Sequence, residues 1–402
     1  MGEQPRGRQV TLSEAAWALL ALALPLTIAG ANGSWMLLTL ALLSAGALSG
    51  WRRAPLPLAA PLAAALAAGL LSTALARTWN SHALLGDLHR LWISVLFGVG
   101  AAAISHRARR RTGLFFALGA AAASLVGICQ AVHARAATGL WGRAHAWVHP
   151  VTYGELIAFA ALGAAALLAA PEQPFPRRRA AWAWAALALY GAALILSGTR
   201  GAVLGFGAGV LVMLLAAPRL RRLSFLALPA LAAAFAAADR LPGGGGRSLW
   251  RGWAAPTRGW AAQGGEQYFR FTLWHSAWGM FLERPITGVG PGNYRANYSR
   301  FAAVGPDNEA TAGSAHNLIA HQLAERGLLG FACVAWLFAV LWIRAWRRSV
   351  REVDAFGLWA VSATAAFAVM NLTEVALQVE QVWMTFFFIW SLGVLGPAEA
   401  AA

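Results

Sequence analysis

The chain contains no lysine and few charged residues of any kind. Only 12% of its 402 residues are charged, against about 25% in ordinary soluble domains. Hydrophobic residues make up 59% of the sequence, and the mean hydropathy is +0.55. This composition excludes an ordinary soluble domain and predicts a membrane protein that crosses the bilayer many times.

Cysteine is nearly absent as well. Cys129 and Cys333 lie in apolar stretches, which excludes a disulfide framework or a cysteine-based metal site. His145 and His149 have i, i+4 spacing, but no carboxylate cluster lies near them in the sequence. The acidic residues expected outside the membrane form no DxD or HExxH pattern: Asp87, Asp239, Glu266, Glu283, Asp307, Glu309, Glu374 and Glu380. We therefore expect no cofactor and a site that works without a metal.

Long apolar stretches dominate what is present. A spanning helix needs about 20 mostly apolar residues. The sequence has twelve candidates, near 14–31, 34–50, 56–75, 90–105, 113–133, 152–170, 180–197, 200–217, 223–238, 317–343, 356–374 and 380–397. The predicted fold is an all-α polytopic membrane protein with about twelve transmembrane helices.

The net charge of +16 comes from arginine alone. A basic chain can bind nucleic acid, but these arginines cluster between apolar stretches, as membrane orientation requires, so we expect no nucleic-acid partner. With a cytoplasmic N-terminus, retained as a signal anchor, the dense clusters all fall inside: Arg6 and Arg8, Arg52 and Arg53, Arg107 and Arg109 to Arg111, Arg177 to Arg179, Arg219, Arg221 and Arg222, and Arg344, Arg347, Arg348 and Arg351. Both termini are then predicted to be cytoplasmic.

One large loop separates the helices of residues 1–238 from those of 317–402. Residues 239–316 form this loop, which the alternation places on the outer face. It starts with a glycine run at 242–246, and the spacing predicts an amphipathic helix over 266–283. Its tryptophans suit a membrane interface. A loop this long is often functional.

Three polar motifs lie on this outer side. In LSGTRGAVLG, at 196–205, Arg200 follows a turn, and Thr199 is predicted to cap the next helix. An arginine at that depth is costly without a partner, although a snorkelling interface arginine explains it equally well. In the second motif, Arg270 precedes the glycine-rich turn ERPITGVGPGNY, whose backbone amides are able to cradle an anion. A surface helix followed by a turn is the simpler reading of that segment.

The third motif is SAHNLIAHQLAERGLLG, at 314–330. Ser314 is predicted to cap a helix with His316 in its first turn, where the helix dipole favours the neutral imidazole that a general base needs. His321 and Glu325 share a helix face, whereas His316 and Glu325 meet only if the helix breaks. Solvated residues at a helix end are the alternative reading.

Together, SGTRGAVLG, the R-x3-W with ERPITGVGPGNY, and HNLIAHQLAERGLLG resemble the O-antigen ligase/polymerase superfamily. The resemblance covers roughly residues 190–345 and is nearest to the O-antigen ligases, which are GT-C-like glycosyltransferases of the bacterial inner membrane. Such enzymes move a glycan from undecaprenyl diphosphate to lipid A–core on the periplasmic face. The resemblance implies that Arg200 and Arg270 bind the diphosphate and that His316 is the catalytic histidine.

Further residues are expected to contact the substrates at this site: Arg135, Arg143, His145, His149, Glu155, Trp274, Asn317, His321 and Glu325. The expected partners are the undecaprenyl-diphosphate-linked glycan, lipid A–core and membrane lipids. The expected reaction is a metal-independent, inverting transfer with His316 as base.

Other functions share these features. An O-antigen polymerase would use the same donor and a second lipid-linked glycan as acceptor. A protein O-oligosaccharyltransferase would transfer the glycan to a protein hydroxyl and is commonly longer. A transporter for lipid-linked sugars would place charged residues along a path through the membrane. The near-absence of charge within the apolar segments favours an enzyme with its site at the membrane surface.

Overall fold

The computed structural model describes residues 6–44, 58–76, 79–170, 177–223, 266–301 and 313–396. Every regular element in these ranges is helical: α1 (Arg6–Ala23), α2 (Ile28–Ser44), α3 (Ala59–Leu75), α4 (Ser81–Ala103), α5 (His106–Thr138), α6 (Pro150–Ala169), α7 (Arg177–Leu196), α8 (Arg200–Ala216), η2 (Arg221–Leu223), α11 (Glu266–Glu283), α12 (Tyr294–Phe301), α13 (Leu318–Arg351), α14 (Ala355–Thr373), η4 (Ala376–Gln378) and α15 (Glu380–Val394).

The described helices make this a helical membrane protein. Six of them (α4, α5, α6, α7, α13 and α14) are long and apolar enough to cross a bilayer, and four shorter apolar helices accompany them. The expected span at 223–238 and the glycine run at 242–246 lie outside the described residues. The count of twelve spans therefore stays a prediction, whereas the helix expected over 266–283 is confirmed by α11.

Several expected boundaries were wrong. The first two helices meet at residues 24–27 and not near 32, because Pro25 lacks the N–H that would continue α1. Helix α5 extends beyond the expected 113–133 at both ends and includes Arg107 and Arg135. Arginine is a good helix former and its long side chain reaches water, so basic ends do not stop a helix.

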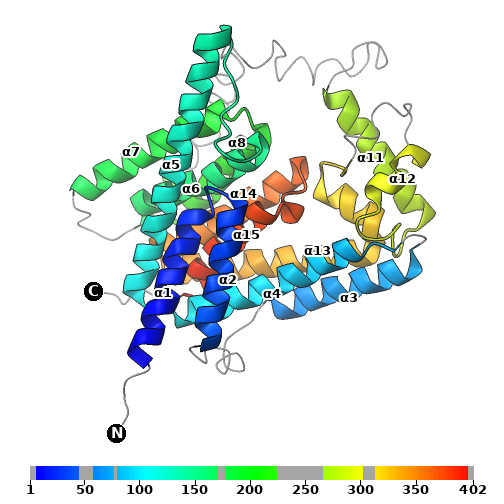
Figure 1. The fold of residues 1–402 in the computed structure, drawn as a ribbon, viewed down its shortest axis with the longest axis horizontal. Helices are drawn as coiled ribbons and strands as arrows, with labels where there is room; N and C mark the ends of the chain where they lie inside the picture. Colours follow the sequence, from blue (N-terminus) through cyan, green and yellow to red (C-terminus); the bar gives the residue numbers. More distant parts are fainter. Residues whose placement is uncertain are drawn as a thin grey trace.

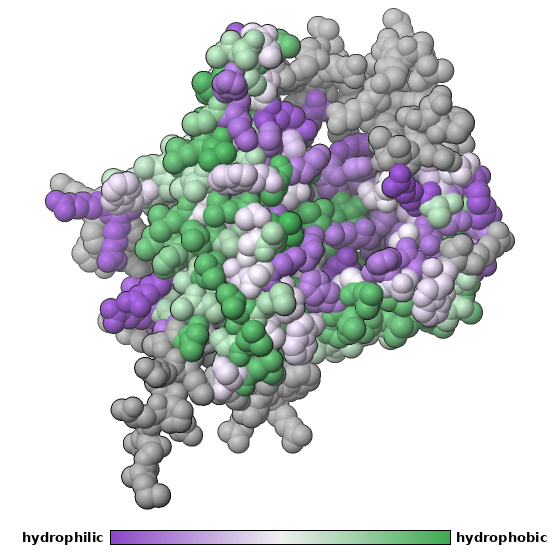
Figure 2. Space-filling view, viewed as in Figure 1, coloured by the Kyte–Doolittle hydropathy of each residue, from purple (hydrophilic) through white to green (hydrophobic). Residues whose placement is uncertain are grey.

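The C-terminal helices form the centre of the molecule (Figure 1). Helices α14 and α15 are buried along most of their length, and α14 packs against α6, α8, α13 and α15. Helices α11 and α12 form a lobe beside the start of α13. Figure 2 shows apolar residues over α1, α2 and α5, whereas hydrophilic residues gather between that side and the α11–α12 lobe.

A glycine stripe brings α8 close to α14. Gly201, Gly205 and Gly209 recur every four residues and face α14. A Cβ atom on Gly205 would come within 3.0 Å of the Ala366 carbonyl oxygen and of the Met370 side chain. Small residues permit such close approach in membrane proteins, where no hydrophobic force drives helices together.

We predict that Gly205→Leu destabilises the protein by about 1–3 kcal/mol, because the larger side chain forces α8 away from α14. The thermal unfolding midpoint of the purified protein in detergent measures this. Gly191→Leu on α7 is the matched control, since nothing lies within 4 Å of an added Cβ there. Equal midpoints for the two variants would contradict the packing of α8 on α14.

Candidate active site

His316 lies just before α13 and not in its first turn. The N-cap is Asn317, whose side-chain oxygen accepts the Ala320 N–H at 3.0 Å. The expectation that Ser314 caps a helix containing His316 was therefore wrong, because asparagine caps as well as serine and lies nearer the helix. His316 has φ +44°, a left-handed conformation that is rare for non-glycine residues and tends to occur at functional sites.

One carboxylate joins His316 to Arg270. Glu374 directly follows α14, and its Oε2 lies 2.5 Å from His316 Nδ1. Its Oε1 accepts a hydrogen bond from Arg270 at 2.9 Å. The side chains of this polar cluster are partly buried: His316 is 33% exposed, Arg270 29% and Glu374 17%.

The end of α14 holds these groups in place. Arg270 also donates to the Thr373 carbonyl, and the Asn317 side-chain amide donates to the Leu372 carbonyl at 2.9 Å. The last carbonyls of a helix have no partner within it and need one elsewhere. Arg270 on α11 and Asn317 before α13 are therefore both anchored to the end of α14.

Arg200 begins α8 beside the same helix end. The neighbouring Gly201 leaves no room for a Cβ against the Thr373 hydroxyl, so the start of α8 and the end of α14 touch. Arg200 is exposed, and among the described residues it has no ion-pair partner. The structure thus brings together the chain segments that carry Arg200, Arg270 and His316.

The turn before Arg200 is fastened by Arg143. Arg143 donates to the Ser197 carbonyl at 2.7 Å and to the Thr199 hydroxyl at 3.2 Å. That hydroxyl donates to the Pro150 carbonyl at 3.0 Å. The prediction that the Thr199 side chain caps α8 was therefore wrong: Thr199 holds the N-cap position, but its hydroxyl joins the turn to α6.

The remaining residues expected on this side differ in exposure. Arg135 and His145 are exposed, and His149 caps α6 by accepting the Val151 N–H at 3.3 Å. Glu155 is 1% exposed within α6, and it lies near enough to Glu374 for the two carboxyl groups to interact electrostatically.

His321 and Glu325 form a second cluster, separate from His316. Both are almost fully buried, and His321 Nε2 lies 3.4 Å from Glu325. The Glu325 carboxylate accepts the backbone N–H groups of Gly292 and Tyr294, each at 2.9 Å. The anion cradled by the glycine-rich turn is therefore this protein's own carboxylate.

Helix α13 does break in this region, at Gly327. This residue has φ +61° and ψ −160°, and it interrupts α13. Residues 285–290 cover the break: the Leu328 N–H donates to the Pro285 carbonyl at 2.8 Å, and the Gly290 N–H donates to the Glu325 carbonyl at 2.9 Å. Because the break lies beyond Glu325, it does not bring Glu325 to His316.

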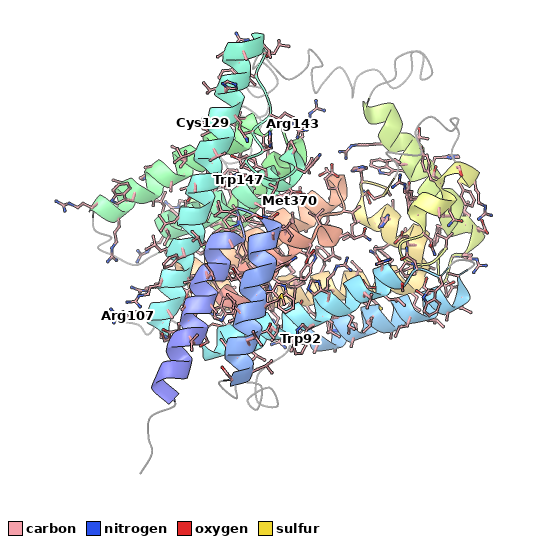
Figure 3. All side chains as sticks on the ribbon, viewed as in Figure 1. Trp92, Arg107, Cys129, Arg143, Trp147 and Met370 are labelled. Atoms are coloured by element: carbon pink, nitrogen blue, oxygen red, sulfur yellow. The ribbon has the colours of Figure 1, made fainter. Side chains whose placement is uncertain are left out.

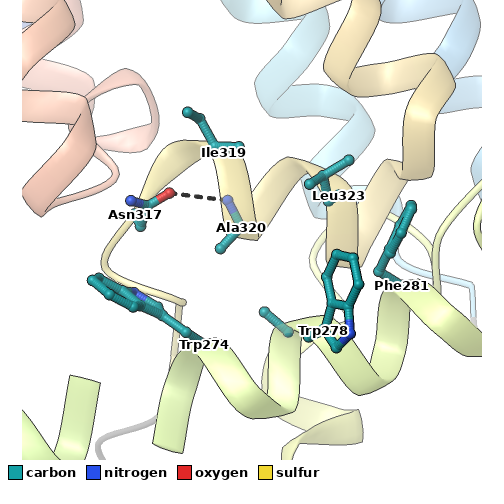
Figure 4. A pocket seen from close by; sticks show the side chains of 8 residues that line it. Trp274, Trp278, Phe281, Asn317, Ile319, Ala320 and Leu323 are labelled. Atoms are coloured by element: carbon teal, nitrogen blue, oxygen red, sulfur yellow. Dashed lines mark hydrogen bonds between the residues drawn. The ribbon is translucent and has the colours of Figure 1, made fainter. Parts of the chain in front are cut away.

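An apolar groove opens beside the N-cap of α13 (Figure 4). It has a volume of about 390 Å³ and lies between α11 and the first turns of α13. Its lining residues are Trp274, Ala277, Trp278, Phe281, Asn317, Ile319, Ala320 and Leu323. Trp274 also donates from its indole to the Ala315 carbonyl at 3.0 Å, so it supports the backbone next to His316.

One comparison with known proteins finds a family match over part of the chain. Residues 185–335 match the family described as O-antigen ligase. The resemblance to the O-antigen ligase/polymerase superfamily is confirmed, and it supports a function of that general type. The matched part runs from α7 into α13 and contains Arg200, Arg270 and His316; Glu374 lies beyond it. No curated protein matches the chain.

Sequence reasoning missed Glu374 as a member of the site. The available signal was its isolation: Glu374 and Glu380 are the only charged residues between 355 and 397. An ionisable residue in such an apolar region is a functional candidate with a partner to be found. The sequence did not identify that partner, because 58 residues separate Glu374 from His316.

We predict that Glu325→Gln loosens residues 288–301. The two carboxylate oxygens accept two backbone N–H groups, but a glutamine amide has only one oxygen, so its NH₂ group would face one of these N–H groups. A buried donor left without an acceptor costs about 1–3 kcal/mol. Hydrogen exchange of that segment should become faster. Glu283→Gln, which removes a surface ion pair with Arg300, is the control and should change exchange little. Unchanged exchange together with lost activity would instead indicate that Glu325 contacts the substrate.

Proposed function

We propose that this protein is a membrane glycosyltransferase that moves a glycan from undecaprenyl diphosphate to lipid A–core. The observation that carries the proposal is the meeting of His316, Arg270 and the start of α8 at the end of α14. The family match over this part of the chain supports the same reaction class.

Arg200 and Arg270 would bind the donor diphosphate. Cleavage of the glycosyl–phosphate bond leaves negative charge on the diphosphate, and a guanidinium is always charged and binds phosphate in a bidentate manner. Charge placed in advance where the transition state needs it is often the largest single catalytic contribution. Arg270 donates a hydrogen bond to the end of α14, and Arg200 begins a helix that packs against α14, which favours a fixed geometry.

His316 would act as the general base. In a single displacement, the acceptor hydroxyl oxygen attacks the anomeric carbon of the donor sugar, and the bond from that carbon to the diphosphate oxygen breaks. The hydroxyl proton passes to His316, and undecaprenyl diphosphate leaves. Such a step inverts the anomeric centre and needs no metal.

The groove beside His316 suits the lipid part of the donor. Its lining is almost entirely apolar, and it lies next to Asn317, which adjoins the proposed base. We assign it to the polyisoprenyl chain. His321 and Glu325, which we expected near substrate, instead have contacts that fit a structural role under the loop.

The orientation belongs to the same proposal. Figure 3 shows Arg107 and Arg143 toward opposite ends of the helical body. Arg107 belongs to a dense cluster of the kind that marks the cytoplasmic side, and Arg143 touches the turn before Arg200. The site would then face the periplasm, in an inner-membrane protein with about twelve spans and cytoplasmic termini.

We predict that the purified protein, mixed with undecaprenyl-diphosphate-linked glycan in EDTA, glycosylates lipid A–core. His316→Ala should lower the rate by about 10²- to 10⁴-fold, because the base is lost. The measurement is the appearance of glycosylated lipid A–core. His133→Ala, on the exposed end of α5, is the matched control and should keep the activity.

A second acceptor separates the nearest alternatives. Chain growth on added lipid-linked glycan, without transfer to lipid A–core, would make the protein a polymerase. Loss of activity in EDTA would overturn the metal-independent step, and a trapped glycosyl-enzyme would overturn the single displacement. No transfer to either acceptor by folded protein would contradict the proposed function.

A further inference from the structure

The contact with Glu374 fixes the tautomer of His316. A carboxylate is an acceptor only, so the hydrogen bond from His316 to Glu374 Oε2 requires the proton on Nδ1. In the neutral imidazole the second nitrogen, Nε2, then has a lone pair. The contact therefore decides which nitrogen of His316 is able to accept a proton.

Glu374 is itself rigidly placed. Its backbone N–H donates to the Met370 carbonyl at 2.9 Å, where α14 ends. The chain that follows is fastened by the Asn371 side chain, which accepts the Leu377 N–H at 2.9 Å. Because the second carboxylate oxygen is bound by Arg270, the plane of the carboxylate is fixed as well.

We propose that Glu374 is the positioning residue for His316: it keeps the proton on Nδ1, directs Nε2 to the acceptor hydroxyl, and stabilises the imidazolium that forms when Nε2 takes the proton. This inference rests on the proposed function. The balance of the step is simple, since the hydroxyl loses one proton to Nε2 while Glu374 remains ionised throughout. A buried carboxylate has this role beside the histidine of serine proteases.

The contact with Arg270 adds a second consequence. At rest, Glu374 neutralises the charge of Arg270, and a donor diphosphate competes with it for the guanidinium. Removing the charge of Glu374 therefore weakens the base but leaves Arg270 more available to phosphate. The weaker base lowers kcat, whereas the more available Arg270 lowers the donor KM, so the two effects can be measured separately.

The test is Glu374→Gln in the full-length protein, assayed with the donor and lipid A–core. Glutamine has nearly the same volume, but its amide can donate to Nδ1 and so permits the wrong tautomer. We expect kcat to fall by about 10²- to 10⁴-fold, since the corresponding amide substitution in a protease triad lowers kcat by about 10⁴-fold. The donor KM should stay equal or fall. Glu374→Asp, which keeps the carboxylate, should retain more activity than Glu374→Gln.

The separate effects on kcat and on the donor KM distinguish this role from a merely structural one, because a variant that only disturbs the fold would impair both constants. Glu380→Gln is the matched control, since Glu380 lies 3.7 Å from His89, and it should leave both constants unchanged.

Three results would overturn the inference. They are wild-type kcat in a folded Glu374→Gln variant, a raised donor KM with unchanged kcat, and equal activity of Glu374→Asp and Glu374→Gln. Each of these requires an active wild-type protein. An inactive wild type would instead contradict the proposed function, so the two failures are distinguishable.

Discussion

The site depends on the need to satisfy the carbonyl groups at the C-terminal end of α14. The last carbonyls of a helix have no partner within the helix, so they need partners elsewhere. The Leu372 and Thr373 carbonyls receive theirs from Asn317 and Arg270. Two segments distant in the sequence are thereby fixed to one helix end, and His316 is fixed with them.

A second backbone requirement fixes the far end of the first segment of α13, residues 318–326. Gly327 interrupts α13, and the groups released by the break pair with residues 285–290. The approach is so close that a Cβ at Gly288 would lie 2.3 Å from the Glu325 carbonyl carbon. The glycine-rich turn and the histidine motif are thus two halves of one structure, which explains why both occur in the chain.

The sequence predicted which residues belong to the site better than it predicted which of them contact one another. Helix periodicity gave the bounds of α11, and the polar motifs pointed to Arg200, Arg270 and His316. Spacing also suggested a substrate role for Glu325. The sequence shows that Glu325 and His321 form an i, i+4 pair, but it does not show that the glycine-rich turn covers this pair. The sequence could not predict the contact of Glu374 with His316, because helical periodicity identifies residues that are neighbours on one helix and not residues that meet from different segments.

The two arginines of the site are not equivalent. Arg270 is bound to a carbonyl and a carboxylate, so its position is set before any ligand arrives, but an anion must displace Glu374 to use it fully. Arg200 is exposed and, within the described chain, has no ion-pair partner, so its charge is available at once. On the proposed function, the diphosphate would therefore meet Arg200 first. The loosening of the Arg270–Glu374 pair would follow, leaving Glu374 to His316 at the stage when the base needs it.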